Sequence, residues 1–277
     1  MPQLVFLHGP GAGACADAYY YQLKHFKGSV APTLPGHLEG APCPDIKSYM
    51  EWVRGWLWAQ GLKKDFVFVG YTLGASIALQ YGLDYPDEVK GMVIMTVAAR
   101  PKTRPPGTYE MRLRAEQDPN GKGYEEWLAF QAHTMQFVEP GLREKLMERH
   151  RQVGPMSQLH DLKTIDAFDV RDRIGTLKPK LLLLRGLDDP GKPPEYEKEI
   201  HEAVPGSQYL KLAGVGHFPP TENPAKINSL IEEFVATLEL GGEGKARGER
   251  REIWLLEETQ SSILRPQVAY TVLRRWV

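Results

Sequence analysis

The chain has 277 residues, 42% of them hydrophobic and 25% charged, which is ordinary for a globular protein with one sizeable core. Its 34 basic and 35 acidic side chains give a formal net charge of −1, so the total charge does not favour binding to nucleic acid or an anionic membrane. The sequence shows no signal-peptide pattern, no apolar run that could span a bilayer and no metal-ligand spacing of cysteine and histidine. Two cysteines in a chain of this length favour reduced thiols, and we expect a cytoplasmic protein.

Short apolar runs alternate with helix-like segments over the first hundred residues. The runs are rich in aliphatic and β-branched side chains and are followed by turn residues, which is typical of buried parallel strands. The alternation predicts an α/β fold with a mostly parallel central sheet and helices on both faces. Strands are predicted at about 4–7, 29–32, 66–71 and 91–97, and helices at about 19–26, 49–60 and between Gly74 and Pro86.

Residues 101–170 interrupt this alternation. The segment opens with three prolines and continues with helical patterns, and it contains no strand signal. We interpret it as a helical cap or lid that is inserted into one core domain, made of residues 1–100 and 171–240. The helical patterns lie around 110–116, 124–137 and 142–153; after the insertion, strands are predicted at 179–184 and 208–212 and helices at 195–204 and 224–238.

Residues 241–277 form a C-terminal extension. A glycine-rich linker at 241–251 precedes two strand-like runs, 252–256 and 267–273. We expect these runs to supply edge strands of the sheet, either in the same molecule or exchanged between the subunits of a homodimer. An amphipathic helix or a flexible tail is the alternative.

The most informative motif is the run from Val67 to Gly74, in which an apolar strand leads into G-x-T-x-G and then into a helix-like segment. The nucleophile elbow has the pattern G-x-S-x-G, where a strand-to-helix turn exposes the serine at the top of a sheet. Here Thr72 occupies the position of that serine.

The elbow is one of five motifs, and the others lie at 7–13, 31–37, 184–190 and 214–224. In this chain order the motifs resemble the α/β-hydrolase family, close to its small esterases and C–C hydrolases with a helical cap, over residues 3 to about 238. The resemblance implies an α/β-hydrolase fold and the chain order nucleophile, acid, histidine, which corresponds to Thr72, Asp189 (or its neighbour Asp188) and His217. Family members usually have a β-hairpin before the first of these motifs, and the C-terminal extension is a candidate to replace it. Besides the elbow, the motifs are L-H-G-P-G-A-G at 7–13, A-P-T-L-P-G-H at 31–37, L-R-G-L-D-D-P at 184–190 and G-V-G-H-F-P-P-T-E-N-P at 214–224.

The resemblance also assigns a role to each position. His217 would take the proton of the Thr72 hydroxyl, and Asp189 would orient the imidazole. The developing oxyanion needs N–H donors, and the backbone of Leu73 is one of them. The second donor is expected at Pro10, which has no N–H, so Gly11 is the candidate replacement.

Aromatic side chains are candidates for the walls of a substrate pocket, although packing between the lid and the core is the alternative for each. His8 and His37 are interpreted as structural residues of their loops. The candidate pocket residues are Tyr71, Trp127, Phe130, Phe137 and Phe218.

The sequence therefore predicts a carboxylesterase-like hydrolase that cleaves an ester or related acyl bond of a small apolar substrate with a threonine nucleophile. No metal or organic cofactor, nucleic acid or membrane is expected as a partner. Two alternatives remain open: a ligand-binding relative with weak or no turnover, and a non-hydrolytic lyase in which His217 acts as a general base.

Overall fold

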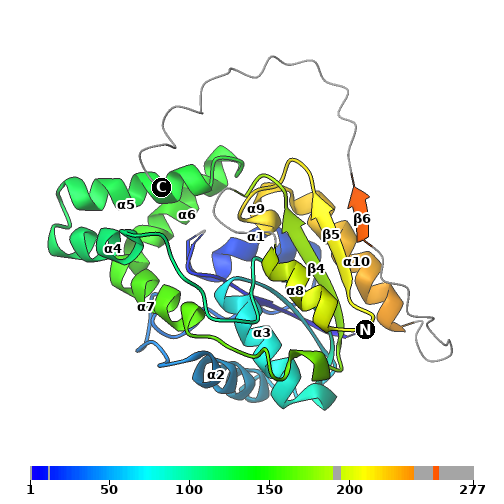
Figure 1. The fold of residues 1–277 in the computed structure, drawn as a ribbon. Helices are drawn as coiled ribbons and strands as arrows, with labels where there is room; N and C mark the ends of the chain where they lie inside the picture. Colours follow the sequence, from blue (N-terminus) through cyan, green and yellow to red (C-terminus); the bar gives the residue numbers. More distant parts are fainter. Residues whose placement is uncertain (1, 12, 190–194, 240–251, 256–277) are drawn as a thin grey trace, which may run out of the picture.

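The computed structural model describes residues 2–11, 13–189, 195–239 and 252–255. In this part of the chain six parallel strands form one sheet in the order β1-β2-β3-β4-β5-β6, and helices cover both faces (Figure 1). The predicted α/β architecture is confirmed. The strands are β1 (Gln3–Leu7), β2 (Phe66–Tyr71), β3 (Val89–Met95), β4 (Lys180–Gly186), β5 (Gln208–Leu212) and β6 (Glu252–Leu255).

Two hydrophobic cores lie on the two faces of the sheet. In β2, Phe66 and Phe68 belong to one core, whereas Val67 and Val69 belong to the other. Successive side chains of a strand point to opposite faces, so a strand that is covered on both sides must be apolar throughout. One core includes residues of α2 (Ile46–Ala59), α3 (Leu73–Asp84) and α8 (Glu195–Ala203), and the other packs against α1 (Tyr20–His25) and α10 (Pro224–Glu239). The short helix α9 (Pro219–Glu222) contacts both α1 and α10.

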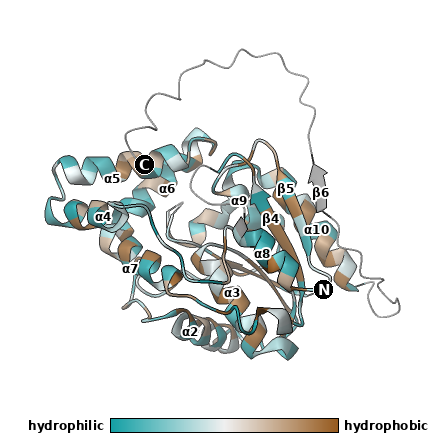
Figure 2. Cartoon of the chain, viewed as in Figure 1, coloured by the Kyte–Doolittle hydropathy of each residue, from teal (hydrophilic) through white to brown (hydrophobic). Residues whose placement is uncertain are grey.

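Four helices lie between β3 and β4 in the chain, and we call them the helical insertion. They are α4 (Thr108–Gln117), α5 (Lys122–Thr134), α6 (Pro140–Val153) and α7 (Pro155–Asp166). The helices α4 and α6 are largely hydrophilic, in contrast to the strands (Figure 2). The sequence patterns predicted the first three helices but not α7 as a separate helix, because only Gly154 divides it from α6.

The predicted strand at 29–32 is wrong. Val30 makes one parallel bridge to Val5, with its N–H donating to the Leu4 carbonyl and its carbonyl accepting from the Phe6 N–H. The next backbone positions include Pro32, which has no N–H to extend the ladder. Both cysteines are free thiols.

Part of the C-terminal extension lies at an edge of the sheet. Residues Glu252–Leu255 form β6, which pairs in parallel with β5. This is the edge opposite β1, so β6 does not occupy the place of a hairpin that would precede β1. The strand-like run at 267–273 and the linker at 241–251 lie outside the described residues.

Candidate active site

Thr72 lies in the turn between β2 and α3 and has an unusual backbone conformation. Its φ is +50° and its ψ is −109°, a region that L-residues seldom adopt and that is strained for a β-branched side chain. Its N–H donates to the Met95 carbonyl at 3.1 Å, and its carbonyl accepts from the N–H of Ser76 at 3.0 Å. The neighbouring strand and the first turn of α3 therefore hold the strained turn in place.

The glycines of G-x-T-x-G are required by close backbone packing. A Cβ on Gly74 would lie 2.0 Å from the Leu7 carbonyl oxygen, and a Cβ on Gly70 would lie 2.7 Å from the Gly74 carbonyl. Gly9, in the loop after β1, has the same constraint, because its Cβ would lie 2.0 Å from Thr72 Oγ1. The elbow thus packs directly against the end of β1.

The carboxyl ends of β4 and β5 bring a carboxylate and an imidazole together. Asp189 follows β4, and its Oδ2 lies 2.9 Å from His217 Nδ1. A carboxylate only accepts, so Nδ1 carries the proton and Nε2 is left as the basic nitrogen. Asp189 is almost fully buried, whereas the His217 side chain is 17% exposed. This pair has the orientation that a histidine base requires.

Two other carboxylates hold the loop that carries His217. Asp188 Oδ2 accepts from the Gly214 N–H at 2.7 Å, so it is Asp189 and not Asp188 that contacts the imidazole. Glu222 accepts from the N–H groups of Gly216 and Phe218, on either side of His217. Burial raises the pKa of Glu222 despite these bonds. Glu222 was not among the predicted site residues; an acidic residue in the first turn of a helix that begins with Pro-Pro was the available signal.

The Thr72 hydroxyl is buried beside Gly9, and its Oγ1 has no hydrogen-bond partner among the described residues. The expected hydrogen bond between Thr72 and His217 is therefore not formed in this conformation. A β-branched side chain has few χ1 rotamers, which limits the directions in which this hydroxyl can point.

The buried guanidinium group of Arg185 lies close to Asp189. Arg185 Nη1 is 3.8 Å from Asp189 Oδ2 and 3.7 Å from Glu197 Oε2. Burial raises the pKa of Glu197 to about 7, although Arg185 opposes that shift. The positive charge of Arg185 favours the ionised form of Asp189, which is the form that orients a histidine.

The loop after β1 lies beside the elbow. His8 is buried, accepts from the Leu34 N–H through Nε2 at 3.0 Å and donates from Nδ1 to the Gly9 carbonyl at 3.1 Å. Burial lowers the pKa of His8 well below its ordinary value, so the ring is neutral and positions the loop. The Gly11 carbonyl accepts from the Tyr71 hydroxyl at 3.1 Å.

Leu73 is the first residue of α3. The first N–H groups of a helix have no partner within the helix, and they interact favourably with negative charge.

The aromatic candidates for the pocket lie in different environments. Tyr71 and Phe218 are buried together with their rings 5.8 Å apart, and Phe218 also lies against Gly11. Trp127 is fully buried inside the helical insertion. Phe130 and Phe137 are 43% and 44% exposed, and Phe137 lies close to Gly216, next to His217. Gln131 and Gln158, which were not predicted as site residues, extend from the insertion to the loop after β1.

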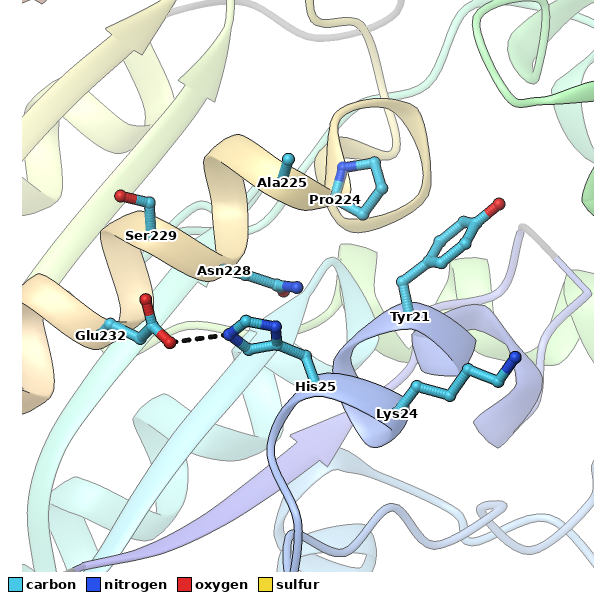
Figure 3. Close-up of a pocket in the computed structure, with 8 residues that line it drawn as sticks. All are labelled: Tyr21, Lys24, His25, Pro224, Ala225, Asn228, Ser229 and Glu232. Carbon is cyan, nitrogen blue, oxygen red and sulfur yellow. Dashed lines mark hydrogen bonds and ion pairs between the residues drawn. The ribbon is translucent and has the colours of Figure 1, made fainter.

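A separate groove lies between α1 and α10, with Tyr21, His25 and Glu232 among its lining residues (Figure 3). His25 Nε2 and Glu232 Oε1 are 2.7 Å apart across it, and both side chains are exposed. None of the residues that line this groove belongs to the site around Thr72. Within the described residues no cluster of His, Cys, Asp and Glu is arranged to hold a metal ion, and no helix is long and apolar enough to cross a membrane.

The chain matches a model of the alpha/beta hydrolase family over residues 4–230. It therefore belongs to this family, and the resemblance inferred from the motifs is confirmed.

Two curated relatives are a hydrolase-superfamily protein and an esterase. The AB hydrolase superfamily protein YisY of Bacillus subtilis is 26% identical over 179 residues, which are 61% of this chain and 65% of that protein, so the chain spans just under two thirds of that relative. The pimeloyl-(acyl-carrier protein) methyl ester esterase of Vibrio vulnificus is 27% identical over 244 residues, which are 80% of this chain and 90% of the relative. A solved structure of a thermophilic esterase from Thermogutta terrifontis superposes with a TM-score of 0.72 at 21% identity, covering 86% of this chain and 90% of its own, and supports the fold.

Proposed function

We propose that this protein is a hydrolase that cleaves an ester or related acyl bond of a small, largely apolar substrate, with Thr72 as nucleophile, His217 as base and Asp189 as the residue that orients the base. The observation that carries the proposal is the bond of 2.9 Å between Asp189 and His217, in a chain that also has a threonine in the strained elbow conformation. The similarity to an esterase of acyl esters supports the same reaction class.

The reaction divides into two acyl transfers. Thr72 Oγ1 attacks the acyl carbon while its proton passes to His217 Nε2, and the Leu73 N–H stabilises the charge on the acyl oxygen. His217 then protonates the departing alkoxide, which leaves an acyl-threonine ester. Water attacks this ester with His217 again as the base, and the acid and the free hydroxyl are released. Catalytic hydrogen bonds often form only when substrate is bound, so the first step includes the formation of the hydrogen bond between Thr72 and His217.

One specific pair of observations favours a second function, a ligand-binding relative with little turnover. Thr72 Oγ1 has no partner among the described residues, and Pro10 has no N–H at the expected oxyanion position. Loss of one oxyanion donor costs about 3–4 kcal/mol of transition-state stabilisation in a serine protease. A protein with both features would keep the site and bind an acyl ligand without hydrolysing it.

Turnover of short-chain p-nitrophenyl esters distinguishes these functions. The natural chain is expected to hydrolyse them and to be labelled by a fluorophosphonate, and His217→Ala is expected to lower kcat by at least about 1000-fold. Asp189→Asn, which keeps the shape of the side chain, is expected to lower kcat strongly as well.

No turnover and no labelling in the natural chain, together with measurable binding of the same esters, would contradict the hydrolase and support the binding protein. An elimination reaction that depends on His217 but not on Thr72 would support a lyase.

A further inference from the structure

The helical insertion contacts the loop that contains Pro10, the residue at the expected oxyanion position that has no N–H. Gln158 of α7 donates from Nε2 to the Pro10 carbonyl at 3.2 Å, across 148 residues of sequence and in a buried environment. Gln158 is 4% exposed. This contact links the insertion directly to the loop beside Thr72.

Its neighbours fix the orientation of the Gln158 amide. Gln158 Oε1 accepts from Trp127 Nε1 at 2.7 Å and from Arg112 Nε at 2.9 Å. Indole and guanidinium groups only donate, so the oxygen must face them and the nitrogen must face the Pro10 carbonyl. The second Nε2 hydrogen goes to Gln131 Oε1 at 3.2 Å. All four hydrogen-bonding positions of the Gln158 amide are therefore used.

The position of the Pro10 carbonyl determines the direction of the next N–H. The described residues contain no cis peptide bond, so the Gly11 N–H points in the direction opposite to the Pro10 carbonyl, on the other side of the C–N bond from Gln158. The following carbonyl, that of Gly11, is held by the Tyr71 hydroxyl at 3.1 Å and by the Ala14 N–H at 3.0 Å. The elbow and the insertion thus restrain the peptide planes on both sides of Gly11, whose N–H donates to no acceptor among the described residues.

We propose that Gln158 is a positioning residue of the oxyanion site: by holding the Pro10 carbonyl it turns the Gly11 N–H toward the reacting acyl oxygen, in place of the donor that Pro10 cannot provide. This inference rests on the proposed acyl-transfer function. It makes the helical insertion part of the catalytic arrangement rather than only a cover over the substrate.

The substitution Gln158→Glu tests it with little change in shape. A glutamate still accepts from Trp127 and Arg112, so the insertion keeps those bonds, but a carboxylate cannot donate to the Pro10 carbonyl. We expect kcat for a p-nitrophenyl ester to fall at least about 10-fold with KM changed by less than about 3-fold, because the donor acts mainly in the transition state. Affinity for phenylboronic acid, which forms a tetrahedral adduct with the nucleophile, should fall in parallel with kcat. The melting temperature serves as the check of folding. Gln158→Met, which also lacks the donor, is expected to lower kcat and the boronate affinity in the same way.

The matched control is Tyr124→Leu, which loosens the packing around Trp127, 5.3 Å from the Tyr124 ring, without touching Gln158. Its kcat should stay within about 2-fold of the natural chain. If Gln158→Glu keeps both kcat and boronate affinity while the natural chain is active, the inference is overturned and the proposed function survives. If the natural chain hydrolyses no acyl ester, the proposed function fails, and the inference fails with it.

Discussion

At the residue scale, Thr72 combines a reactive position with an unfavourable side chain. Its φ of +50° puts a β-branched residue where the backbone alone costs about 1–3 kcal/mol. The branch also limits χ1, and the hydroxyl is buried without a partner in the described residues. The extra methyl group, and not the loss of a hydroxyl, therefore distinguishes this elbow from one with serine.

Replacing Thr72 with serine is expected to increase activity. The unbranched side chain can turn its hydroxyl toward His217 and is less strained at positive φ, so kcat/KM for a p-nitrophenyl ester should rise at least about 10-fold and the free energy of unfolding should rise by about 0.5–1 kcal/mol. Steady-state kinetics and urea denaturation measure the two effects. Thr72→Val is the matched control, since it keeps the branch but has no hydroxyl, and it should be inactive. A lower kcat/KM in Thr72→Ser would indicate that the site is adapted to the methyl group.

The sequence predicted the parts of the site that depend on strand ends. The family resemblance implied the pair of His217 and Asp189, with Asp188 as the alternative, and in the structure Asp189 and His217 follow the neighbouring parallel strands β4 and β5 and are in contact. The state of the Thr72 hydroxyl was not predictable, because it depends on one χ1 angle. The contact between Gln158 and Pro10 was also not predictable, because a polar residue in an amphipathic helix has no sequence signal for a partner 148 residues away.

At the scale of elements, the contact between β1 and α3 sets the geometry of the elbow. The start of α3 approaches the last residue of β1 so closely that only a hydrogen fits on Gly74. This approach places the α3 N-terminus, and with it the Leu73 N–H, beside the loop that contains Gly9 and Pro10.

Gly74→Ala is expected to destabilise the protein by about 2–4 kcal/mol. The new methyl would lie 2.0 Å from the Leu7 carbonyl oxygen, which belongs to backbone that cannot move without separating β1 from α3. Chemical denaturation measures the loss. Gly55→Ala in α2 is the control: a Cβ there meets nothing within 4 Å on an exposed helix face, so it should stabilise by about 0.5–1 kcal/mol. Equal stabilities of the two variants would show that the elbow backbone relaxes freely.

Strands and helices of the core could be predicted because their patterns are strong and local. Each of these buried strands contains a continuous apolar run: Phe66–Val69 in β2, Met92–Met95 in β3 and Leu181–Leu184 in β4. The differences at 29–32 and at α7 have physical reasons. The pairing of Val30 ends near Pro32, which cannot donate to a ladder, and only Gly154 separates α6 from α7, so the boundary between the two helices has little sequence signal.

At the scale of the whole molecule, a buried ion pair fastens the helical insertion to the core. His37, in a core loop, lies 2.6 Å from Asp161 of α7, and its other ring nitrogen lies 3.1 Å from the Leu34 carbonyl. Both partners accept, so both ring nitrogens carry protons and the imidazole is charged. Burial lowers the pKa of His37, but Asp161 more than offsets this and the net shift is upward. This stability contribution is complete below the unfolded pKa and is lost as the pH rises through the folded one.

The buried His150 has the opposite effect on the pH dependence of stability. It stacks on Trp127 with ring centroids 4.3 Å apart, and neither of its ring nitrogens has a partner among the described residues. Burial, with Arg112 and Arg151 nearby, lowers the pKa of His150 to about 3. In the unfolded chain the ring titrates near its ordinary pKa of 6.5. Below that pH the unfolded state gains a proton that the folded state does not, and stability falls.

His150→Phe is therefore expected to make the protein more resistant to acid. One such group costs about 1.4 kcal/mol of stability for each pH unit below its unfolded pKa, or about 2 kcal/mol at pH 5 relative to pH 8. Phenylalanine keeps the stacking on Trp127 and does not titrate, so the difference in unfolding free energy between the variant and the natural chain should grow by that amount from pH 8 to pH 5. Comparing the two proteins at each pH cancels the contributions of His8 and of the His37–Asp161 pair, which both contain. A difference that stays constant across this range would mean that the His150 ring is protonated in the folded protein, with a counter-charge or water inside the helical insertion.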